Sequence, residues 1–274
     1  MPDARVLTKP DIERVFDGAS TSYDRVGPSI FAKFGARLAG MIPLAPGTRL
    51  LDVATGTGAV VAPAAERLGP AGLVIGTDLS ARILHEAEKA ARRKGLKNVQ
   101  FQRMDAECLD LPDESFDAVT CAFALFMFPD MEAALREMHR VCKPGGHLGV
   151  TYFGKMPPPF SPGWPVFAQL CTEYGIGARM PQKLGLTPVE LEGILAKSGF
   201  NVVETIEERN EIVYSDGEAW WSFMMTLGSR AAILSMDHDT RNRFRHEYLS
   251  RLGNTLREDG YHMSTAVLYC LARR

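Results

Sequence analysis

The chain has 274 residues, and its 33 acidic residues against 31 lysines and arginines give a formal net charge of −2. This length fits one large α/β domain with additions, or a domain with a lid. The balanced charge and the absence of a long basic run argue against nucleic acid as the main partner. The longest apolar run, residues 118–128, is too short to cross a bilayer, so we expect no stable membrane insertion.

The cysteines and the N-terminus indicate the expected compartment. Five cysteines are scattered through the chain without a Cys-x-x-Cys pair: Cys108, Cys121, Cys142, Cys171 and Cys270. Their odd number and spacing are typical of reduced thiols and favour neither disulfides nor a structural metal site. No apolar segment follows a basic one at the N-terminus, so we expect no signal peptide and a cytoplasmic protein.

Residues 10–42 carry apolar side chains at helical spacing, among them Ile30, Phe31 and Phe34. They precede the first expected strand of a sheet. We therefore assign residues 1–45 to an N-terminal helical cover over the end of the sheet at which a ligand binds.

The most informative stretch begins with an apolar strand from Thr48 that runs into a turn with Gly56 and Gly58. Glycine lets the backbone bend sharply and approach a ligand closely. Helical spacing follows over residues 59–68, and a second strand then ends on the carboxylate of Asp78. A strand, glycine turn, helix, strand and acid in this order form the first half of a nucleotide-binding α/β sheet, in which the acid binds the ribose hydroxyls.

Two residues indicate which nucleoside cofactor this site binds. A dinucleotide-binding turn has a third glycine three residues after the second, where this chain has Val61. Asp52 precedes the turn, and a buried carboxylate there would repel a pyrophosphate but suits the cationic amino-acid end of S-adenosylmethionine. We therefore expect S-adenosylmethionine as the cofactor and disfavour a nicotinamide-dependent oxidoreductase.

Alternating strand and helix signals continue to residue 153, which is typical of a parallel sheet. We assign residues 46–154 to a cofactor-binding Rossmann-like core. A glycine- and proline-rich connection over residues 154–182 breaks the pattern. The elements expected after it are a helix with an N-terminal capping box, a strand, two helices and a last strand, at residues 187–198, 201–214, 216–228, 238–259 and 264–272.

Residues 155–274 are accordingly expected to complete the sheet and to carry a helical lid, inserted at about residues 216–260. Such an insertion between the last two strands could close over the substrate, pad the edge of the sheet or make a subunit contact. The sequence leaves these alternatives open, and with them the formation of a homo-oligomer.

Five segments follow one another in the order of a known family: residues 51–58, 76–80, 104–106, 116–119 and 135–146. They resemble the motifs of class I S-adenosylmethionine-dependent methyltransferases, in particular the ubiquinone/menaquinone-type enzymes and bacterial natural-product C-methyltransferases. The resemblance implies a Rossmann-like, seven-stranded, mostly parallel sheet with helices on both faces and a helical lid. Ala54 stands where the family has its first glycine, so we expect a slightly altered turn.

The resemblance implies roles for three carboxylates and a tyrosine. Asp78 would accept hydrogen bonds from both ribose hydroxyls, Asp52 would orient the methionine ammonium, and Asp105 would meet the adenine amino group. Tyr23 resembles a family tyrosine that closes over the cofactor. The other expected cofactor contacts lie in the glycine turn or near strand ends: Ala54, Thr55, Gly56, Thr57, Gly58, Leu79, Met104, Ala106, Cys121 and Ala122.

Aromatic and methionine side chains concentrate after the fourth strand, in the proline-rich connection and in the lid, above the strand ends where substrates bind. The expected substrate contacts are Phe123, Phe126, Phe153, Trp164, Trp220, Trp221 and Met224. They favour a largely apolar small molecule, an isoprenoid or aromatic natural product, methylated on carbon with coupled cyclisation. No histidine is well placed as a general base, so no catalytic residue is assigned. Two alternatives remain open: an O-methyltransferase of a phenolic small molecule, and a non-methylating S-adenosylmethionine-binding or cyclising module.

Overall fold

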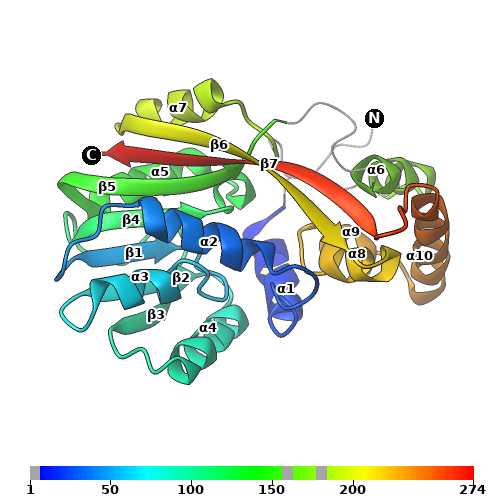
Figure 1. Cartoon of the computed structure of the whole chain (residues 1–274), viewed down its shortest axis with the longest axis horizontal. Helices are drawn as coiled ribbons and strands as arrows, with labels where there is room; N and C mark the ends of the chain where they lie inside the picture. Colours follow the sequence, from blue (N-terminus) through cyan, green and yellow to red (C-terminus); the bar gives the residue numbers. More distant parts are fainter. Residues whose placement is uncertain (1–6, 156–162, 177–183) are drawn as a thin grey trace.

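The computed structural model describes residues 7–155, 163–176 and 184–274, which form a seven-stranded sheet in the order β3-β2-β1-β4-β5-β7-β6 (Figure 1). The strands are β1 Arg49–Val53, β2 Leu73–Asp78, β3 Val99–Arg103, β4 Phe116–Ala122, β5 Cys142–Phe153, β6 Asn201–Tyr214 and β7 Tyr261–Arg273. The first five strands run parallel, and β7 is antiparallel to both of its neighbours. The predicted fold class, a mostly parallel Rossmann-like sheet, is confirmed.

Helices cover both faces of this sheet (Figure 1). The helices of the described residues, some of which lie beyond the sheet, are α1 Lys9–Ala19, α2 Ile30–Met41, α3 Val61–Leu68, α4 Ala81–Arg93, α5 Met131–Val141, α6 Gly163–Glu173, α7 Pro188–Lys197, α8 Gly217–Met224, α9 Ser229–Leu234 and α10 His238–Gly253. Successive side chains of β1 point to opposite faces, so Leu50 joins the core under α2 and α3, and Leu51 joins the core under α5 and α7. Among the described residues, no helix has the length and apolar character needed to span a membrane.

The last two strands extend beyond the rest of the sheet as a long antiparallel ribbon (Figure 1). Their pairing runs from Asn201 opposite Arg273 to Tyr214 opposite Tyr261. The far end of the ribbon carries α8, α9 and α10, and α6 packs against α10. The helices expected between the last two strands are therefore present, with the short α9 added between the two predicted ones.

The sequence pattern misses α6, because the prolines of residues 154–182 indicate an irregular connection. Pro165 lies in the first turn of α6, where a missing backbone N–H loses no helical hydrogen bond. The four prolines of residues 157–162 lie outside the described residues. The capping box predicted for α7 is confirmed, because Thr187 and Glu190 each accept from the backbone N–H of the other, at 3.3 and 2.8 Å.

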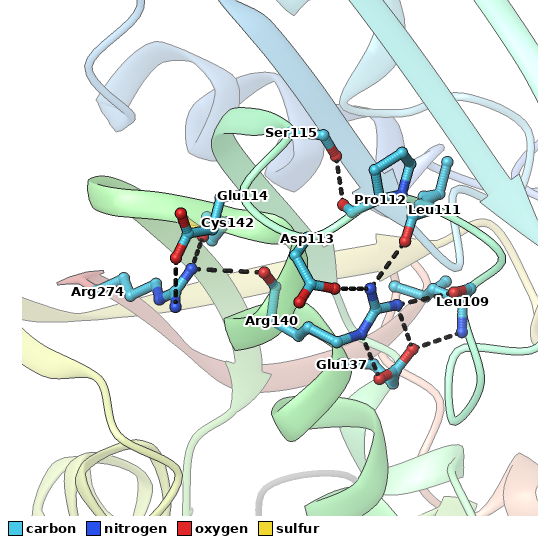
Figure 2. A network of polar contacts seen from close by, with 10 residues as sticks. All are labelled: Leu109, Leu111, Pro112, Asp113, Glu114, Ser115, Glu137, Arg140, Cys142 and Arg274. Atoms are coloured by element: carbon cyan, nitrogen blue, oxygen red, sulfur yellow. Dashed lines mark hydrogen bonds and ion pairs between the residues drawn. The ribbon is translucent and has the colours of Figure 1, made fainter.

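The loop between β3 and β4 is held to α5 by the guanidinium of Arg140 (Figure 2). Its Nη1 and Nη2 donate to the carbonyls of Leu111 and Leu109, each at 2.8 Å, and its Nε donates to Glu137 at 2.8 Å. Glu137 in turn accepts from the backbone N–H of Leu109 at 2.8 Å. Because buried carbonyls need such partners, these bonds set the course of the loop that begins with residues 104–106.

Candidate functional site

The turn after β1 contains three residues in the left-handed conformation. Ala54, Gly56 and Gly58 have φ angles of 55°, 56° and 87°. Glycine adopts this conformation readily, whereas it costs alanine about 1–2 kcal/mol. The turn therefore forms with alanine at its first position, at a cost in backbone strain.

Asp78 ends β2 beside this turn. Its carboxylate accepts hydrogen bonds from the backbone N–H groups of Gly56 and Ser80, both at 3.0 Å. Burial raises the pKa of Asp78 to about 6. The carboxylate thus fastens the glycine turn to the end of β2, at the carboxyl edge of the sheet.

Asp52 is buried at the end of the neighbouring strand, β1, with 1% of its surface exposed. It accepts from the hydroxyls of Thr55 at 2.6 Å and Thr120 at 2.7 Å. Burial, and to a smaller extent the charge of Asp78, raise the pKa of Asp52 to about 6. Two carboxylates with raised pKa values therefore lie at adjacent strand ends, where a cationic ligand would stabilise their charged forms.

A cavity of about 80 Å³ opens at this edge of the sheet. Its wall includes nine of the predicted cofactor contacts: Tyr23, Ala54, Gly56, Asp78, Leu79, Met104, Asp105, Ala106 and Ala122. The other five lie outside the wall: Asp52, Thr55, Thr57, Gly58 and Cys121. The placement of Cys121 is a correction: it is fully buried in the core under α5, because its side chain alternates with that of Ala122 across β4.

Helix α1 closes one side of this smaller cavity. Lys9 lines the cavity and donates to Asp105 at 2.6 Å and to Glu107 at 2.5 Å, and these contacts raise the pKa of Lys9. Asp17 accepts from the hydroxyl of Ser80 at 2.5 Å. Sequence reasoning misses Lys9, because no local pattern relates it to a carboxylate 96 positions away.

A larger cavity of about 330 Å³ adjoins the smaller one. The two share four lining residues: Phe16, Tyr23, Phe123 and Met127. Of the predicted substrate contacts, Phe123, Phe126, Phe153 and Trp164 line the larger cavity. The sequence patterns miss further apolar residues of its wall, among them Ile30, Phe31, Phe223, Leu227 and Met263. Their helical or strand spacing marks them only as core residues, and no signal in the sequence distinguishes them from the core.

The three lid residues predicted to contact the substrate lie in a core instead. Trp220 and Met224 are fully buried, Trp221 is 7% exposed, and none of the three lines the larger cavity. The Nε1 of Trp220 donates to the hydroxyl of Tyr248 at 2.5 Å, and this hydroxyl contacts the Sδ of Met224 at 3.0 Å. Their spacing therefore reflects the packing of α8 against α10, and the prediction of substrate contact is corrected.

Comparison with known proteins shows the family. Residues 50–146 match the family described as a methyltransferase domain. The chain is 35% identical over 161 residues to aklanonic acid methyltransferase DauC of Streptomyces sp. (strain C5), which covers 56% of this chain and 73% of DauC. The chain belongs to the class I S-adenosylmethionine-dependent methyltransferases. The enzyme transfers a methyl group from S-adenosylmethionine to a small molecule.

Other relatives of this methyltransferase modify different atoms. It is 33% identical over 186 residues to nocamycin O-methyltransferase of Saccharothrix syringae, covering 68% of this chain and 65% of the relative. It is 36% identical over 182 residues to the ubiquinone/menaquinone biosynthesis C-methyltransferase UbiE of Ectopseudomonas mendocina (strain ymp), covering 64% and 67%. The family therefore contains both O- and C-methyltransferases at similar identity to this chain.

Solved structures share the fold of this methyltransferase. A putative methyltransferase from Bacillus halodurans C-125 superposes with a TM-score of 0.60 at 22% identity, covering 88% of this chain and 98% of that one. The cyclase SpnF superposes with a TM-score of 0.57 at 22% identity, covering 98% and 93%. At this identity the likeness shows the fold alone.

The groups around the smaller cavity of the methyltransferase fit S-adenosylmethionine. Asp78 and Asp105 line the cavity as hydrogen-bond acceptors, and Lys9, a cation of this wall, is already paired with Asp105 and Glu107. Asp52 adds a buried negative charge beneath the glycine turn. These carboxylates suit a ligand that carries hydroxyls, an amino group and a positive charge. They would repel a pyrophosphate, which is negatively charged.

The raised pKa values predict that cofactor binding by the methyltransferase depends on pH. Because Asp52 and Asp78 are protonated below about pH 6, the affinity for S-adenosylhomocysteine should be constant above about pH 7 and fall about tenfold or more by pH 5. In the free protein the same groups should lower the free energy of unfolding as the pH rises from about 4 to 6, because the folded state holds protons that the unfolded state has released.

Isothermal titration with S-adenosylhomocysteine across this pH range checks the prediction. Asp78→Asn serves as the control variant, since an amide does not titrate and the fall in affinity at low pH should be shallower. An affinity that stays constant from pH 7 to pH 5 in the wild-type enzyme would contradict the prediction.

Proposed function

We propose that the acceptor of this methyltransferase is a largely apolar small molecule that binds in the larger cavity, while the cofactor binds in the smaller one. The observation that carries this proposal is the wall common to both cavities, to which Phe16, Tyr23, Phe123 and Met127 contribute. A cofactor in one cavity and an acceptor in the other would meet at these residues. Proximity and alignment of this kind are what an in-line methyl displacement needs first.

In this proposal carboxylates hold the cofactor. Asp78 accepts from the ribose hydroxyls, and Asp52, covered by Thr55, orients the methionine ammonium through the turn. Asp105, which Lys9 holds in place at 2.6 Å, accepts from the adenine amino group. The bound cofactor supplies an electrophilic methyl group on its sulfonium.

Tyr23 separates the reacting groups from water in this proposal. Its ring stacks on Phe31 at 5.3 Å and meets Phe16 edge-on at 5.7 Å, and a Cβ added at Gly56 would lie 3.5 Å from it. Burial raises the pKa of Tyr23 far above its ordinary value. The hydroxyl therefore stays protonated, so it can donate a hydrogen bond but cannot serve as a base.

The residues that line the larger cavity favour transfer of the methyl group to a carbon atom. Its described lining residues include no histidine and no carboxylate. A neutral hydroxyl nucleophile would need a base to lose its proton, whereas an electron-rich ring or alkene carbon can attack the methyl group without one. We therefore favour an isoprenoid or aromatic natural product methylated on carbon, with aromatic faces stabilising a cation and allowing coupled cyclisation.

O-methylation of a phenolic small molecule is the second candidate. It is favoured by the similarity to nocamycin O-methyltransferase over 68% of this chain. A phenol that reaches the cavity already ionised would need no base from the protein. The position of the new methyl group in the product separates the two candidates.

Two phenylalanines provide a matched test of the two-cavity arrangement, since Phe126 lines only the larger cavity and Phe128 only the smaller. Phe126→Ala should reduce methyl transfer about 10-fold or more through lost apolar contact, while the affinity for S-adenosylhomocysteine changes less than about twofold. Phe128→Ala should weaken S-adenosylhomocysteine binding instead. Transfer is measured with methyl-labelled S-adenosylmethionine and a panel of polycyclic phenols, quinols and prenylated rings.

Nuclear magnetic resonance of the product then locates the methyl group. A Phe126→Ala enzyme of full activity, or turnover of strongly polar acceptors alone, would contradict the apolar acceptor. A product methylated only on oxygen would select the second candidate function.

A further inference from the structure

The larger cavity carries one positive charge among its described lining residues, that of Lys155. The other polar side chains of this wall are hydroxyls, of Tyr23, Ser229, Ser264 and Thr265. Ser229 is committed to the fold, because its hydroxyl donates to the carbonyl of Met224 at 2.6 Å. Lys155 therefore stands in an otherwise apolar wall that holds no described carboxylate to balance it.

The backbone at Lys155 is held on both sides. The N–H of Lys155 donates to the carbonyl of Leu186 at 2.8 Å, and the N–H of Gly154 donates to the carbonyl of Ala266 at 2.7 Å. A Cβ at Gly154 would lie 2.6 Å from the Cβ of Ala266, so the two strands approach closely here. Lys155 follows Phe153 by two positions, so both side chains leave the same face of the extended chain, and both line the cavity. The lysine thus continues the aromatic wall of the cavity.

The hydroxyl of Thr265 lies beside this lysine. The antiparallel pairing of β5 with β7 continues through the bond between Gly154 and Ala266, which brings Thr265 opposite Lys155. Thr265 and its neighbour Ser264 both line the cavity. Successive side chains of β7 point to opposite faces, so the hydroxyl of Thr265 lies on the face of Lys155 and that of Ser264 does not. The hydroxyl of Thr265 makes only a long contact, 3.5 Å, with the carbonyl of Ala266, so it can donate to a ligand beside the ammonium.

No described residue neutralises the charge of Lys155. Within the residues that the structure describes, Lys155 forms no ion pair, whereas Lys9 in the smaller cavity is bonded to both Asp105 and Glu107. Lys155 is an exposed residue of this wall, so its ammonium stays hydrated beside a neutral apolar ligand, which gains nothing from the charge. A ligand with a negative charge would form an ion pair with this ammonium and so bind more tightly than its neutral analogue, by the modest factor typical of an exposed pair.

We propose that Lys155, with the hydroxyl of Thr265, binds an oxyanion carried by the acceptor. The substrate class is then an apolar molecule with one acidic group, such as a carboxylate or an ionised enol or phenol. This inference rests on the proposed function, because it requires the acceptor to occupy the larger cavity. Lys155 would then be a specificity-determining residue. It would recognise the charge of the acceptor, whereas the rest of the cavity wall contacts its apolar surface.

Two probes with the same rings test this inference: 2-naphthoate, which is negatively charged, and 2-naphthamide, which is neutral. Each is titrated by isothermal calorimetry into the enzyme saturated with S-adenosylhomocysteine. The wild-type enzyme should bind 2-naphthoate about 2- to 5-fold more tightly than 2-naphthamide. Lys155→Met should abolish this preference without changing the affinity for 2-naphthamide, and Lys155→Arg should keep it.

Lys197→Met is the control for unspecific attraction, since Lys197 is an exposed lysine at the end of α7. This variant should retain the wild-type preference. Equal binding of the two probes by the wild-type enzyme, or an equal loss of 2-naphthoate affinity in Lys155→Met and Lys197→Met, would overturn the anion site and leave the apolar acceptor cavity in place. If neither probe bound although S-adenosylhomocysteine did, the proposed function would fail and the anion site with it.

Discussion

Replacement of Asp78 by alanine is expected to weaken binding of S-adenosylmethionine by about 10- to 100-fold, since hydrogen bonds to a charged group contribute about 1.5–3 kcal/mol each. The carboxylate also accepts from the N–H groups of Gly56 and Ser80, so the variant loses the acceptor that fastens the glycine turn. Isothermal titration with S-adenosylhomocysteine measures the affinity, and chemical denaturation measures the accompanying loss of stability.

Asp237→Ala is the matched control for this experiment. Asp237 caps α10 by accepting from the N–H groups of Asp239 and Thr240, and it lines neither cavity. Asp237→Ala should lose about 1 kcal/mol of stability with its cap, whereas Asp78→Ala loses an acceptor but also removes a buried charge, so its stability should change less. Only Asp78→Ala should lose cofactor affinity, and equal affinities in the two variants would reject the ribose-binding role of Asp78.

Trp220→Ala is expected to lower the free energy of unfolding by about 3–5 kcal/mol, because it removes a large side chain from a closed core. The indole is fully buried, and its Nε1 donates to the hydroxyl of Tyr248, which in turn donates to the carbonyl of Gly163 at 3.1 Å. The substitution therefore opens a void between α8 and α10 and removes one partner of a buried polar group. Urea denaturation measures the loss.

Trp164→Ala separates packing from substrate contact, because Trp164 is only half-buried and lines the larger cavity. This variant should lose less stability than Trp220→Ala and should lose methyl transfer at temperatures where it is fully folded. A Trp220→Ala enzyme with wild-type stability but without methyl transfer would return Trp220 to the set of substrate contacts.

The cofactor half of the site is predictable from the sequence because its signals are local. The spacing from the glycine turn to Asp78 follows from the strand, turn and helix that join them, and the parallel sheet then brings both strand ends to one edge. The error at Cys121 has a physical reason too. A central strand is apolar on both faces, so its sequence does not tell which side chains face a ligand at its end.

The acceptor half of the site is less predictable, because a cavity wall and a closed core are both formed by apolar side chains at the same helical or strand spacing. Phe126 and Trp164 line the larger cavity, whereas Trp220 is buried between α8 and α10, although all three are aromatic residues in the segments expected above the strand ends. Phe223 lines the cavity, yet its spacing in α8 gives the same helical signal as its neighbours. Only the packing of α8, α9 and α10 on the rest of the structure shows which of these residues line the cavity and which are buried in the core.

The sequence by itself determined the class of fold, the course of the chain through the sheet, the cofactor and the carboxylate at the end of β2. Turn chemistry and the alternation of strands and helices act over a few residues, so they can be read along the chain. Only the tertiary structure decided that Lys9 reaches Asp105, that Lys155 lines an apolar wall, and that Trp220 belongs to a core. These contacts join segments far apart in the chain, and they depend on how whole helices pack, which no local pattern records.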